Sequence, residues 1–322
     1  MQPFWPYIDA LLPKGSPVPG IDLLCQMMRD YPARGGKGLR GQLLLECAAA
    51  FGVGKERALP LAAALELFQS WVLIHDDIED ASEERRGGPA LHRLHGIPLA
   101  INAGDALHAY MWQAVLSSAV PGAAEEFLAT VQRTAEGQHI ELLWIRSGTW
   151  SVSSADYLQM VQLKTAHYTV VAPLRLGMLA AGVQPDARLL PAGLALGAAF
   201  QICDDALNLT GGPTYGKERA GDLLEGKRTL ILLDWLASAG EADRQRALDW
   251  LGRPRAEKDQ AGLAWLEGQL RGSGAVERAM EVAATEARRG LGILAEVWKA
   301  APHPERTLAL QETLAGLADR TH

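Results

Sequence analysis

The sequence has few cysteines and no segment typical of export. Its three cysteines, Cys25, Cys47 and Cys203, have no paired metal-ligand spacing, and an odd number without a signal peptide predicts reduced thiols in a cytosol. Residues 1–12 lack the basic start and the cleavage pattern of a targeting sequence. We therefore expect a cytoplasmic protein whose cysteines are ordinary core residues.

Long apolar runs and an excess of positive charge are also absent. The longest candidate for a membrane span, residues 168–183, is interrupted by Pro173 and Arg175, so no span is expected. The net charge is −7, from 31 basic and 38 acidic residues. Because binding to a phosphate backbone needs a basic surface, nucleic acid is not an expected partner, and any basic site must be local.

Alternating runs with a period of two are scarce, whereas apolar residues often recur at spacings of three and four. The hydrophobic fraction of 48% is sufficient for a large core, and no linker rich in proline and serine divides the 322 residues. Glycine, proline and aspartate separate helix-sized pieces at roughly 19–31, 38–52, 56–80, 98–119, 122–147, 154–181, 187–210 and several after 228. The sequence predicts an all-α protein with one domain over residues 1–322.

Two aspartate-rich segments interrupt this apolar, helix-forming sequence. The first contains Asp76, Asp77 and Asp80, and the second contains Asp204 and Asp205. Residues four apart share a face of a helix, so Asp76 and Asp80 should point the same way. Adjacent carboxylates repel one another and are costly to desolvate, which favours a cation between them. Mg²⁺ is the best candidate, because it takes oxygen ligands from one or two carboxylates, phosphates and waters.

His75 beside the first segment raises the alternative of a zinc or iron site. No second histidine has a suitable spacing on that helix, and His92 and His95 follow the next turn of the chain. A transition-metal site is therefore not expected.

Clusters of basic residues alternate with the acidic segments. Glycine and cations occur together in residues 34–41, 83–95 and 211–228, and Lys164 with Thr165 lies inside a long apolar helix. Each cluster alone is explained by a solvated turn or a structural salt bridge. Together they suggest several phosphate-binding groups beside metal-binding carboxylates, because guanidinium forks and glycine-rich backbone both suit diphosphates.

These motifs together resemble the trans-isoprenyl diphosphate synthases, or polyprenyl synthetase family, over nearly the whole span from Gly35 to Thr229. The family motifs are Gly-Gly-Lys with a following Arg, Asp-Asp-x-x-Asp with Arg-Arg-Gly, Lys-Thr, Phe-Gln-x-x-Asp-Asp, and Gly-Lys with Asp-Leu-x-Glu-Gly-Lys. The matching residues are Gly35, Gly36, Lys37, Arg40, Asp76, Asp77, Asp80, Arg85, Arg86, Gly87, Lys164, Thr165, Phe200, Gln201, Asp204, Asp205, Gly216, Lys217, Asp222, Leu223, Glu225, Gly226 and Lys227.

The resemblance implies a chain elongation in which an allylic diphosphate ionises and the double bond of isopentenyl diphosphate attacks the carbocation. It implies that Asp76, Asp80 and Asp204 hold Mg²⁺ on the allylic diphosphate, with Asp77 and Asp205 in support. The expected ligands of the same diphosphate are Arg85, Lys164, Lys217 and Lys227. Those of isopentenyl diphosphate are Lys37, Arg40, Arg86 and Gln69, the last at a position where many members carry histidine. Thr165 and Gln201 are expected to face the carbocation.

The resemblance also implies a helical bundle of the isoprenoid synthase type, with a central cleft for diphosphate and Mg²⁺, and a homodimer. Two features depart from the family pattern. Asn208 stands where the second motif often has aspartate, and the chain ends without the basic tail of some farnesyl enzymes. Because Asp204 is the main ligand expected there, we expect activity to be retained.

Product length depends on residues that precede the first aspartates. Trp71 and Phe68 lie five and eight residues before Asp76, roughly 7.5 to 12 Å down the same helix, so the indole could form a floor for the prenyl chain. Simple core packing explains these aromatics equally well. Val72 is small, and no insertion separates Asp77 from Asp80. Among relatives this combination is most like geranylgeranyl diphosphate synthases, followed by farnesyl diphosphate synthases.

Two other functions are compatible with the motifs. A class I terpene cyclase also begins with a metal-bound diphosphate, but it does not need Lys37, Arg40 and Arg86 for a second one. A non-catalytic regulatory subunit of a prenyl synthase keeps the fold but loses aspartates from these motifs, whereas this chain keeps all five. Both alternatives are therefore less favoured than a synthase.

Overall fold

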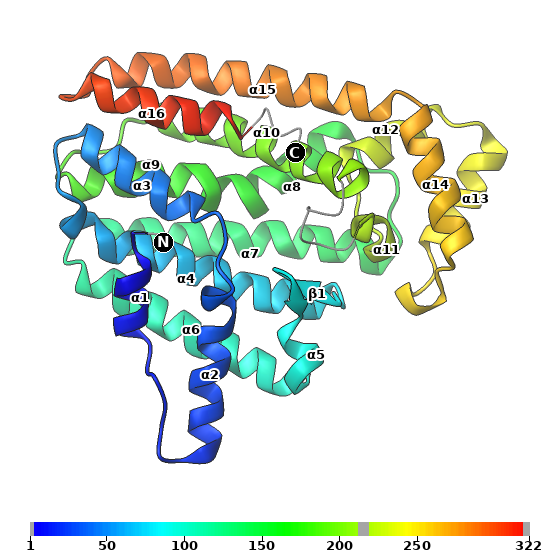
Figure 1. Ribbon diagram of the computed structural model, residues 1–322. Coiled ribbons are helices and arrows are strands. Elements are labelled where there is room, and N and C mark those ends of the chain that lie inside the picture. The colour runs from blue at the N-terminus through cyan, green and yellow to red at the C-terminus, as the bar shows by residue number, and fades with distance from the viewer. Residues whose placement is uncertain (1–2, 212–218, 318–322) are drawn as a thin grey trace. The chain divides into compact units, whose positions relative to one another are not determined.

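A computed structural model describes residues 3–211 and 219–317 (Figure 1). The helices in chain order are α1 (Trp5–Leu11), α2 (Pro19–Ala33), α3 (Leu39–Ala50), α4 (Lys55–Glu79), α5 (Leu91–His95), α6 (Ile97–Ser117), α7 (Ala123–Ser147), α8 (Ser154–Val161), the π-helix η1 (Gln162–Val171), α9 (Ala172–Ala180), α10 (Leu189–Thr210), α11 (Gly221–Glu225), α12 (Leu230–Ser238), α13 (Glu241–Leu251), the 3₁₀ helix η2 (Arg255–Glu257), α14 (Gln260–Gly272), α15 (Ala275–Trp298) and α16 (Pro304–Ala315). The only strands in the described ranges are β1 (Glu84–Arg85) and β2 (Gly88–Pro89), which pair antiparallel. The expected all-α class is confirmed.

The chain divides into two compact units. One contains residues 1–131, 168–190 and 293–313, and the other contains residues 132–167, 191–292 and 314–322. Each unit has its own hydrophobic core. The expectation of a single domain over residues 1–322 stays a prediction.

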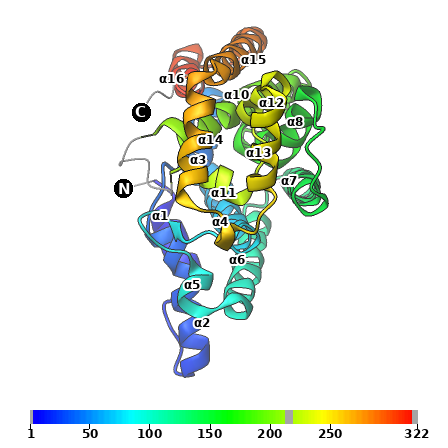
Figure 2. The same ribbon diagram turned by 90° about the vertical axis from the view of Figure 1, so that its right-hand side faces the viewer.

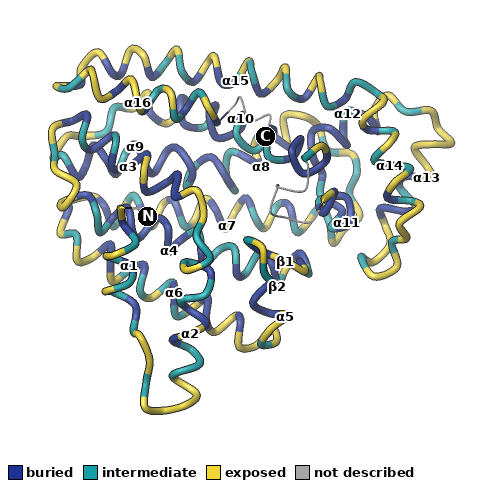
Figure 3. Tube along the Cα trace, viewed as in Figure 1, coloured by how far each residue is buried: buried dark blue, intermediate teal, exposed yellow. Residues whose placement is uncertain are grey.

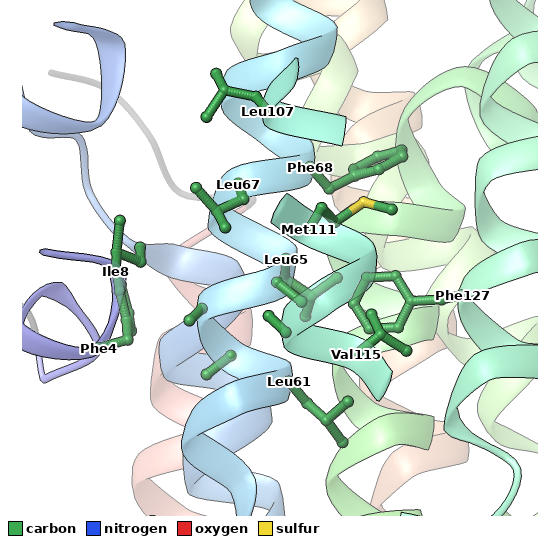
Figure 4. Packing of buried hydrophobic residues seen from close by; sticks show 14 of the residues in the cluster. Phe4, Ile8, Leu61, Leu65, Leu67, Phe68, Leu107, Met111, Val115 and Phe127 are labelled. Carbon is green, nitrogen blue, oxygen red and sulfur yellow. The ribbon is translucent and has the colours of Figure 1, made fainter. Parts of the chain in front are cut away.

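In the first unit, α4 is the central helix, and α3, α6 and α9 pack against it or against each other. Most of α4 is buried or half-buried in Figure 3, whereas the connection between α1 and α2 is exposed. Figure 4 shows side chains of this core, which come from α4, α6, α7 and the N-terminal segment: Leu61, Leu65, Leu67, Phe68, Leu107, Met111, Val115, Phe127, Phe4 and Ile8. Apolar residues on nearly every face explain why α4 lies inside the unit.

In the second unit, the core combines α8 and α10 with the helices that follow residue 220. Two of these, α13 and α14, lie side by side in both views (Figures 1 and 2), and the Trp250 indole fills the space beside Gly262. Ser153 caps α8 by accepting a hydrogen bond from the Asp156 N–H, while the Asp156 carboxylate accepts one from the Ser153 N–H. Most of α10, including the second aspartate-rich segment, belongs to this unit.

Every helix-sized piece expected from the sequence contains a helix with similar bounds. The loop at residues 83–95 also contains the β1–β2 hairpin and α5, and the loop at residues 211–228 contains α11. The segment expected as one helix over 154–181 is interrupted by ten residues of π-helix. The helix α1, before the first expected helix, was not predicted.

One described helix, α4, is long and apolar enough to cross a membrane, although the sequence pointed to residues 168–183 as the closest candidate. Buried residues make up 61% of the apolar window in α4, as in the core helix of a soluble protein. The three cysteines are all buried and form no disulfide, which confirms them as core residues.

Candidate active site

The first aspartate-rich segment forms the C-terminal end of α4. Asp80 is the C-cap residue, and its N–H donates to the Asp76 carbonyl at 2.8 Å. The Asp77 side chain is fully buried, whereas the Asp76 side chain is 19% exposed. Asp80 is also buried, at 7% exposure, so Asp76 is the most exposed of the three aspartates.

Asp77 is held by two buried partners. The Tyr31 hydroxyl of α2 donates to Asp77 Oδ2 at 2.6 Å, and the Arg85 Nε of β1 donates to Oδ1 at 2.9 Å. Burial and the Asp77 carboxylate both raise the pKa of Tyr31, which keeps its proton in place. Burial alone would lower the pKa of Arg85, but Asp77 and Asp76 raise it overall. Asp77 is thus a structural carboxylate that anchors Arg85 beside Asp76, whose Oδ2 lies 3.6 Å from the guanidinium.

The second segment, on α10, shows the same arrangement. The Tyr157 hydroxyl of α8 donates to Asp205 Oδ2 at 2.7 Å, and the Gln201 amide donates to Oδ1 at 2.7 Å. Burial raises the pKa of Asp205 to about 6, opposed by these two hydrogen bonds. Asp204, the preceding residue, is half-buried. In each segment a buried tyrosine therefore holds the second aspartate, and the first is left more accessible.

The side chains of Thr165 and Gln201, both expected to face the carbocation, are in contact with each other. The Thr165 hydroxyl donates to Gln201 Oε1 at 2.8 Å, so a chain of hydrogen bonds connects Thr165, Gln201, Asp205 and Tyr157. The Gln201 amide oxygen accepts this hydrogen bond, and the Thr165 oxygen keeps its lone pairs. The chain fixes the orientation of both side chains.

Lys164 and Thr165 lie on the π-helix η1, a rare geometry that is frequent at functional sites. The Lys164 ammonium forms an ion pair with the buried Glu141 of α7. A Cβ on Gly137 of α7 would collide with the Lys164 backbone, so only glycine permits this close approach of the two helices. The structural salt bridge considered for Lys164 therefore exists, and it also positions the ammonium.

Arg40 and Arg86, expected to bind a second diphosphate, lie in the first unit. Arg40 is buried, donates to Thr169 at 2.8 Å and lies over the Tyr168 ring. Arg86 donates to the Tyr31 carbonyl at 2.6 Å, and a Cβ on Gly36 would lie only 3.1 Å from its guanidinium. Lys37 is exposed just before α3, and Gln69 of α4 is half-buried.

A pocket in this unit is lined by Phe4, Trp5, Ile8, Pro32, Gly35, Gly36, Glu66, Ser70 and Arg86. Glu66 is a buried carboxyl that accepts a hydrogen bond from the Gly41 N–H at 2.9 Å. Burial raises the pKa of Glu66, while that N–H and the neighbouring Arg40 and Arg86 act in the opposite direction. The pocket thus combines glycine-rich backbone and a guanidinium with apolar side chains and one buried carboxyl.

Lys227 and Asn208 belong to the second unit. The Lys227 ammonium lies 2.8 Å from Glu225 and 3.8 Å from Asp222. The Asn208 side-chain oxygen accepts a hydrogen bond from the Asp222 N–H at 3.2 Å. The backbone carbonyl of Asn208 accepts a second one from the Ala220 N–H. Asn208 therefore connects α10 to the start of α11. Lys217 lies outside the described residues.

The described carboxylates do not form a preassembled metal cage. Within residues 3–211 and 219–317, no three side chains of His, Cys, Asp or Glu gather closely enough to hold a metal ion. A closed zinc-type cage is therefore absent from this part of the chain. Asp76 and Asp204 are each more accessible than the aspartate that follows them, and carboxylate oxygens of this kind are ligands for hard divalent cations.

The residues considered for product length lie on α4. Phe68 is fully buried, whereas Trp71 and Val72 are half-buried. The Phe68 ring meets the Trp71 and Tyr168 rings at centroid distances of 5.5 and 5.4 Å. These aromatics form a continuous group within the first unit.

Sequence reasoning missed Tyr31, Tyr157, Glu141 and Glu66. A tyrosine in an apolar helix signals that its hydroxyl needs a partner, but not which acid it meets. The two glutamates, Glu66 and Glu141, are not part of any of the motifs. Only the packing of elements distant in the sequence identifies these partners.

Comparison with known proteins agrees with these motifs. The family model for polyprenyl synthetase matches residues 21–265. A geranylfarnesyl diphosphate synthase of Aeropyrum pernix is 36% identical over 277 residues, which cover 82% of this chain and 84% of the relative. A geranylgeranyl diphosphate synthase of Sulfolobus acidocaldarius is 36% identical over 237 residues, with 70% and 71% covered.

Among solved structures, a polyprenyl synthase from Caulobacter crescentus CB15, complexed with calcium and isoprenyl diphosphate, has a TM-score of 0.87 and 31% identity. The similarity covers 99% of this chain and 95% of that one. The family model spans most of the sequence, and both relatives exceed 30% identity over more than two thirds of it. This chain belongs to the polyprenyl synthetase family.

Proposed function

We propose that this chain condenses isopentenyl diphosphate head-to-tail with an allylic diphosphate and releases a short-chain all-trans prenyl diphosphate. The observation that carries the proposal is the paired arrangement of the two aspartate segments. In each, a buried tyrosine holds the second aspartate, and the first stays more accessible. Family membership and relatives named as geranylfarnesyl and geranylgeranyl diphosphate synthases support it.

The cofactor we propose is Mg²⁺, held by Asp76, Asp80 and Asp204. When bound, it stabilises the charge that develops on the departing diphosphate. Asp77 and Asp205 each support their own segment through a buried tyrosine partner. Arg85, Lys164, Lys217 and Lys227 hold the allylic diphosphate from the protein side.

The second diphosphate, that of isopentenyl diphosphate, is assigned to Lys37, Arg40, Arg86 and Gln69. Arg86 lines a pocket together with Gly35 and Gly36, which offers both backbone and guanidinium donors. A terpene cyclase needs no such second group. The cations assigned to this second diphosphate therefore favour the synthase over the cyclase.

Thr165 and Gln201 are proposed to face the carbocation. Their hydrogen bond leaves lone pairs on the Thr165 oxygen that can stabilise positive charge nearby. Lys164, on the same π-helix, keeps its ammonium in place through Glu141. The series of hydrogen bonds from Thr165 through Gln201 and Asp205 to Tyr157 fixes the orientation of the hydroxyl and the amide during ionisation.

Radiolabel incorporation tests the function. The purified protein is incubated with labelled isopentenyl diphosphate and an allylic diphosphate, in the presence of Mg²⁺ or of a chelator. We expect label in prenyl products only with the metal. Consumption of the allylic diphosphate without label in the product would favour the cyclase, and activity only with an added partner protein would favour a regulatory subunit.

Restoring aspartate at position 208 is expected to change little. The Asn208 side-chain oxygen accepts the Asp222 N–H, and an aspartate oxygen can accept the same bond. Asn208→Asp should therefore change kcat less than about tenfold at saturating Mg²⁺, a difference of about 1.4 kcal/mol. Titration of Mg²⁺ in both proteins measures this, and a gain of several orders of magnitude would mean that the natural site is crippled.

Geranylgeranyl diphosphate is the proposed main product, favoured over farnesyl diphosphate. The Trp71 indole, half-buried five residues before Asp76, is proposed to stop the growing chain. Trp71→Ala removes this obstacle and should lengthen the product by one or more isoprene units. Chromatography of the dephosphorylated alcohols measures the length, and an unchanged product would remove Trp71 from this role.

A homodimer in the cytoplasm completes the proposal. Sedimentation of the purified protein tests the dimer, because a single species with the mass of one chain would contradict it. Cell fractionation tests the location.

A further inference from the structure

The Trp71 indole is oriented by ring packing and not by a hydrogen bond. Its Nε1 is buried and has no hydrogen-bond partner within residues 3–211 and 219–317. One face of the ring is stacked on His108 of α6, with centroids 4.1 Å apart and an interplanar angle of 23°. Phe68 and His75, on the same helix as Trp71, meet it edge-on.

His108 is itself held in place. The Trp112 indole, one turn further along α6, donates to His108 Nε2 at 2.9 Å. An indole N–H can only donate, so this nitrogen accepts and carries no proton. Burial lowers the pKa of His108, which agrees with a neutral ring. Trp112 in turn packs against Phe127 of α7, with centroids 6.5 Å apart.

Gly104, one turn before His108 on α6, completes the contact. A Cβ at this position would lie 3.3 Å from Trp71 Cδ1 and would collide with the His75 ring. The absence of a side chain lets α6 approach α4 closely enough for the stack. The indole is therefore backed by α6 and remains partly exposed elsewhere.

We propose that His108, braced by Trp112, is a specificity-determining residue that holds the Trp71 indole where it limits the length of the prenyl chain. This inference rests on the proposed function. A stop formed by one indole works only if the ring resists displacement by the growing chain. The stack on His108 is the closest ring contact of Trp71, nearer than the edge contacts of Phe68 and His75, and the Nε1 is not anchored by a hydrogen bond. His108 touches no reacting atom and acts through Trp71.

The decisive variant is His108→Ala, which removes the stacked ring and leaves Trp71 held only by its edge contacts with Phe68 and His75. We expect the ratio of products one isoprene unit longer to the natural product to rise about two- to tenfold, the range that corresponds to the loss of one aromatic pair. His108→Phe keeps a flat ring in the stack and should restore the natural product. Trp112→Phe removes the hydrogen bond to His108 but keeps an aromatic ring at position 112. This variant should give a smaller shift in the same direction.

Gln113→Ala is the matched control, because Gln113 is exposed on the same helix. Product length is measured by chromatography, together with total incorporation and the urea midpoint of each variant. If His108→Ala does not fold, Trp112→Phe carries the test, and an unchanged product from it would overturn the inference. Normal incorporation with unchanged length in His108→Ala, or an equal shift in Gln113→Ala, would also overturn it. Absence of incorporation by the natural protein would instead refute the proposed function.

Discussion

Replacing Asp76 with asparagine is expected to lower kcat about a thousandfold, the upper cost of removing one preorganised group that stabilises the transition state. Asp76 is the accessible carboxylate of the first segment, whereas Asp77 is buried against Tyr31 and Arg85. The asparagine has nearly the same shape, so folding should be retained. Steady-state kinetics with labelled isopentenyl diphosphate measures the loss, and Asp204→Asn should reproduce it.

The control for this experiment is Glu84→Gln, which removes one negative charge from an exposed residue on β1. Its kcat should remain within about twofold of the natural value, since screening weakens the effect of an exposed charge. Calorimetric titration of Mg²⁺ with a non-reacting diphosphate provides a second readout. Weaker metal binding in Asp76→Asn but not in Glu84→Gln is expected, and a natural kcat in Asp76→Asn would contradict the assignment of this ligand.

The second large effect concerns stability. Arg85→Met should lower the free energy of unfolding by about 3–5 kcal/mol, the cost of leaving a buried charge without its partner. The Asp77 side chain has no exposed surface, so water cannot replace the guanidinium. Urea denaturation without substrate measures this loss separately from any role of Arg85 in binding diphosphate.

Two further variants isolate the cause. Arg93→Met removes the cation of an exposed ion pair with Glu83 and should cost less than about 1 kcal/mol. Adding Asp77→Asn to Arg85→Met removes the stranded charge and should recover part of the stability. A loss below about 1 kcal/mol in Arg85→Met would show that Asp77 does not depend on this pair.

The sequence predicts the helices because long apolar segments, many with apolar residues three and four apart, are bounded by glycine, proline or aspartate. The 25 residues of α4 are apolar on nearly every face and end at the acidic segment, so both its place in the core and its end could be expected. Bounds near glycine and proline agree to within a few residues. The hairpin at Glu84–Pro89 was not expected, because two-residue strands carry no periodic signal.

Other features depend on contacts that spacing cannot reveal. The π-helix at residues 162–171 replaces the regular helix expected there, although nothing in its composition marks the change. Its neighbour Gly137, 27 residues before Lys164, is an ordinary glycine in the sequence, yet it permits the close approach of α7. Local propensity is a weak guide where tertiary packing sets the backbone.

For the site, the motifs predict which residues act as ligands, but they do not predict the different environments of adjacent aspartates. Adjacent aspartates look equivalent in the sequence, yet Tyr31 and Tyr157 make the second of each pair structural. These tyrosines lie 46 and 48 residues away from their aspartates, beyond the reach of any local pattern. The aromatic support of Trp71 by His108 is likewise a contact between two helices.

The most direct test of the central claim is product analysis with defined starters. Purified protein is incubated with Mg²⁺, labelled isopentenyl diphosphate and dimethylallyl, geranyl or farnesyl diphosphate, and the dephosphorylated products are separated by chromatography. We predict labelled prenyl alcohols longer than the starter, with geranylgeraniol as the main product. The absence of label in any prenyl alcohol, with all three starters, would contradict the assignment as a prenyl diphosphate synthase.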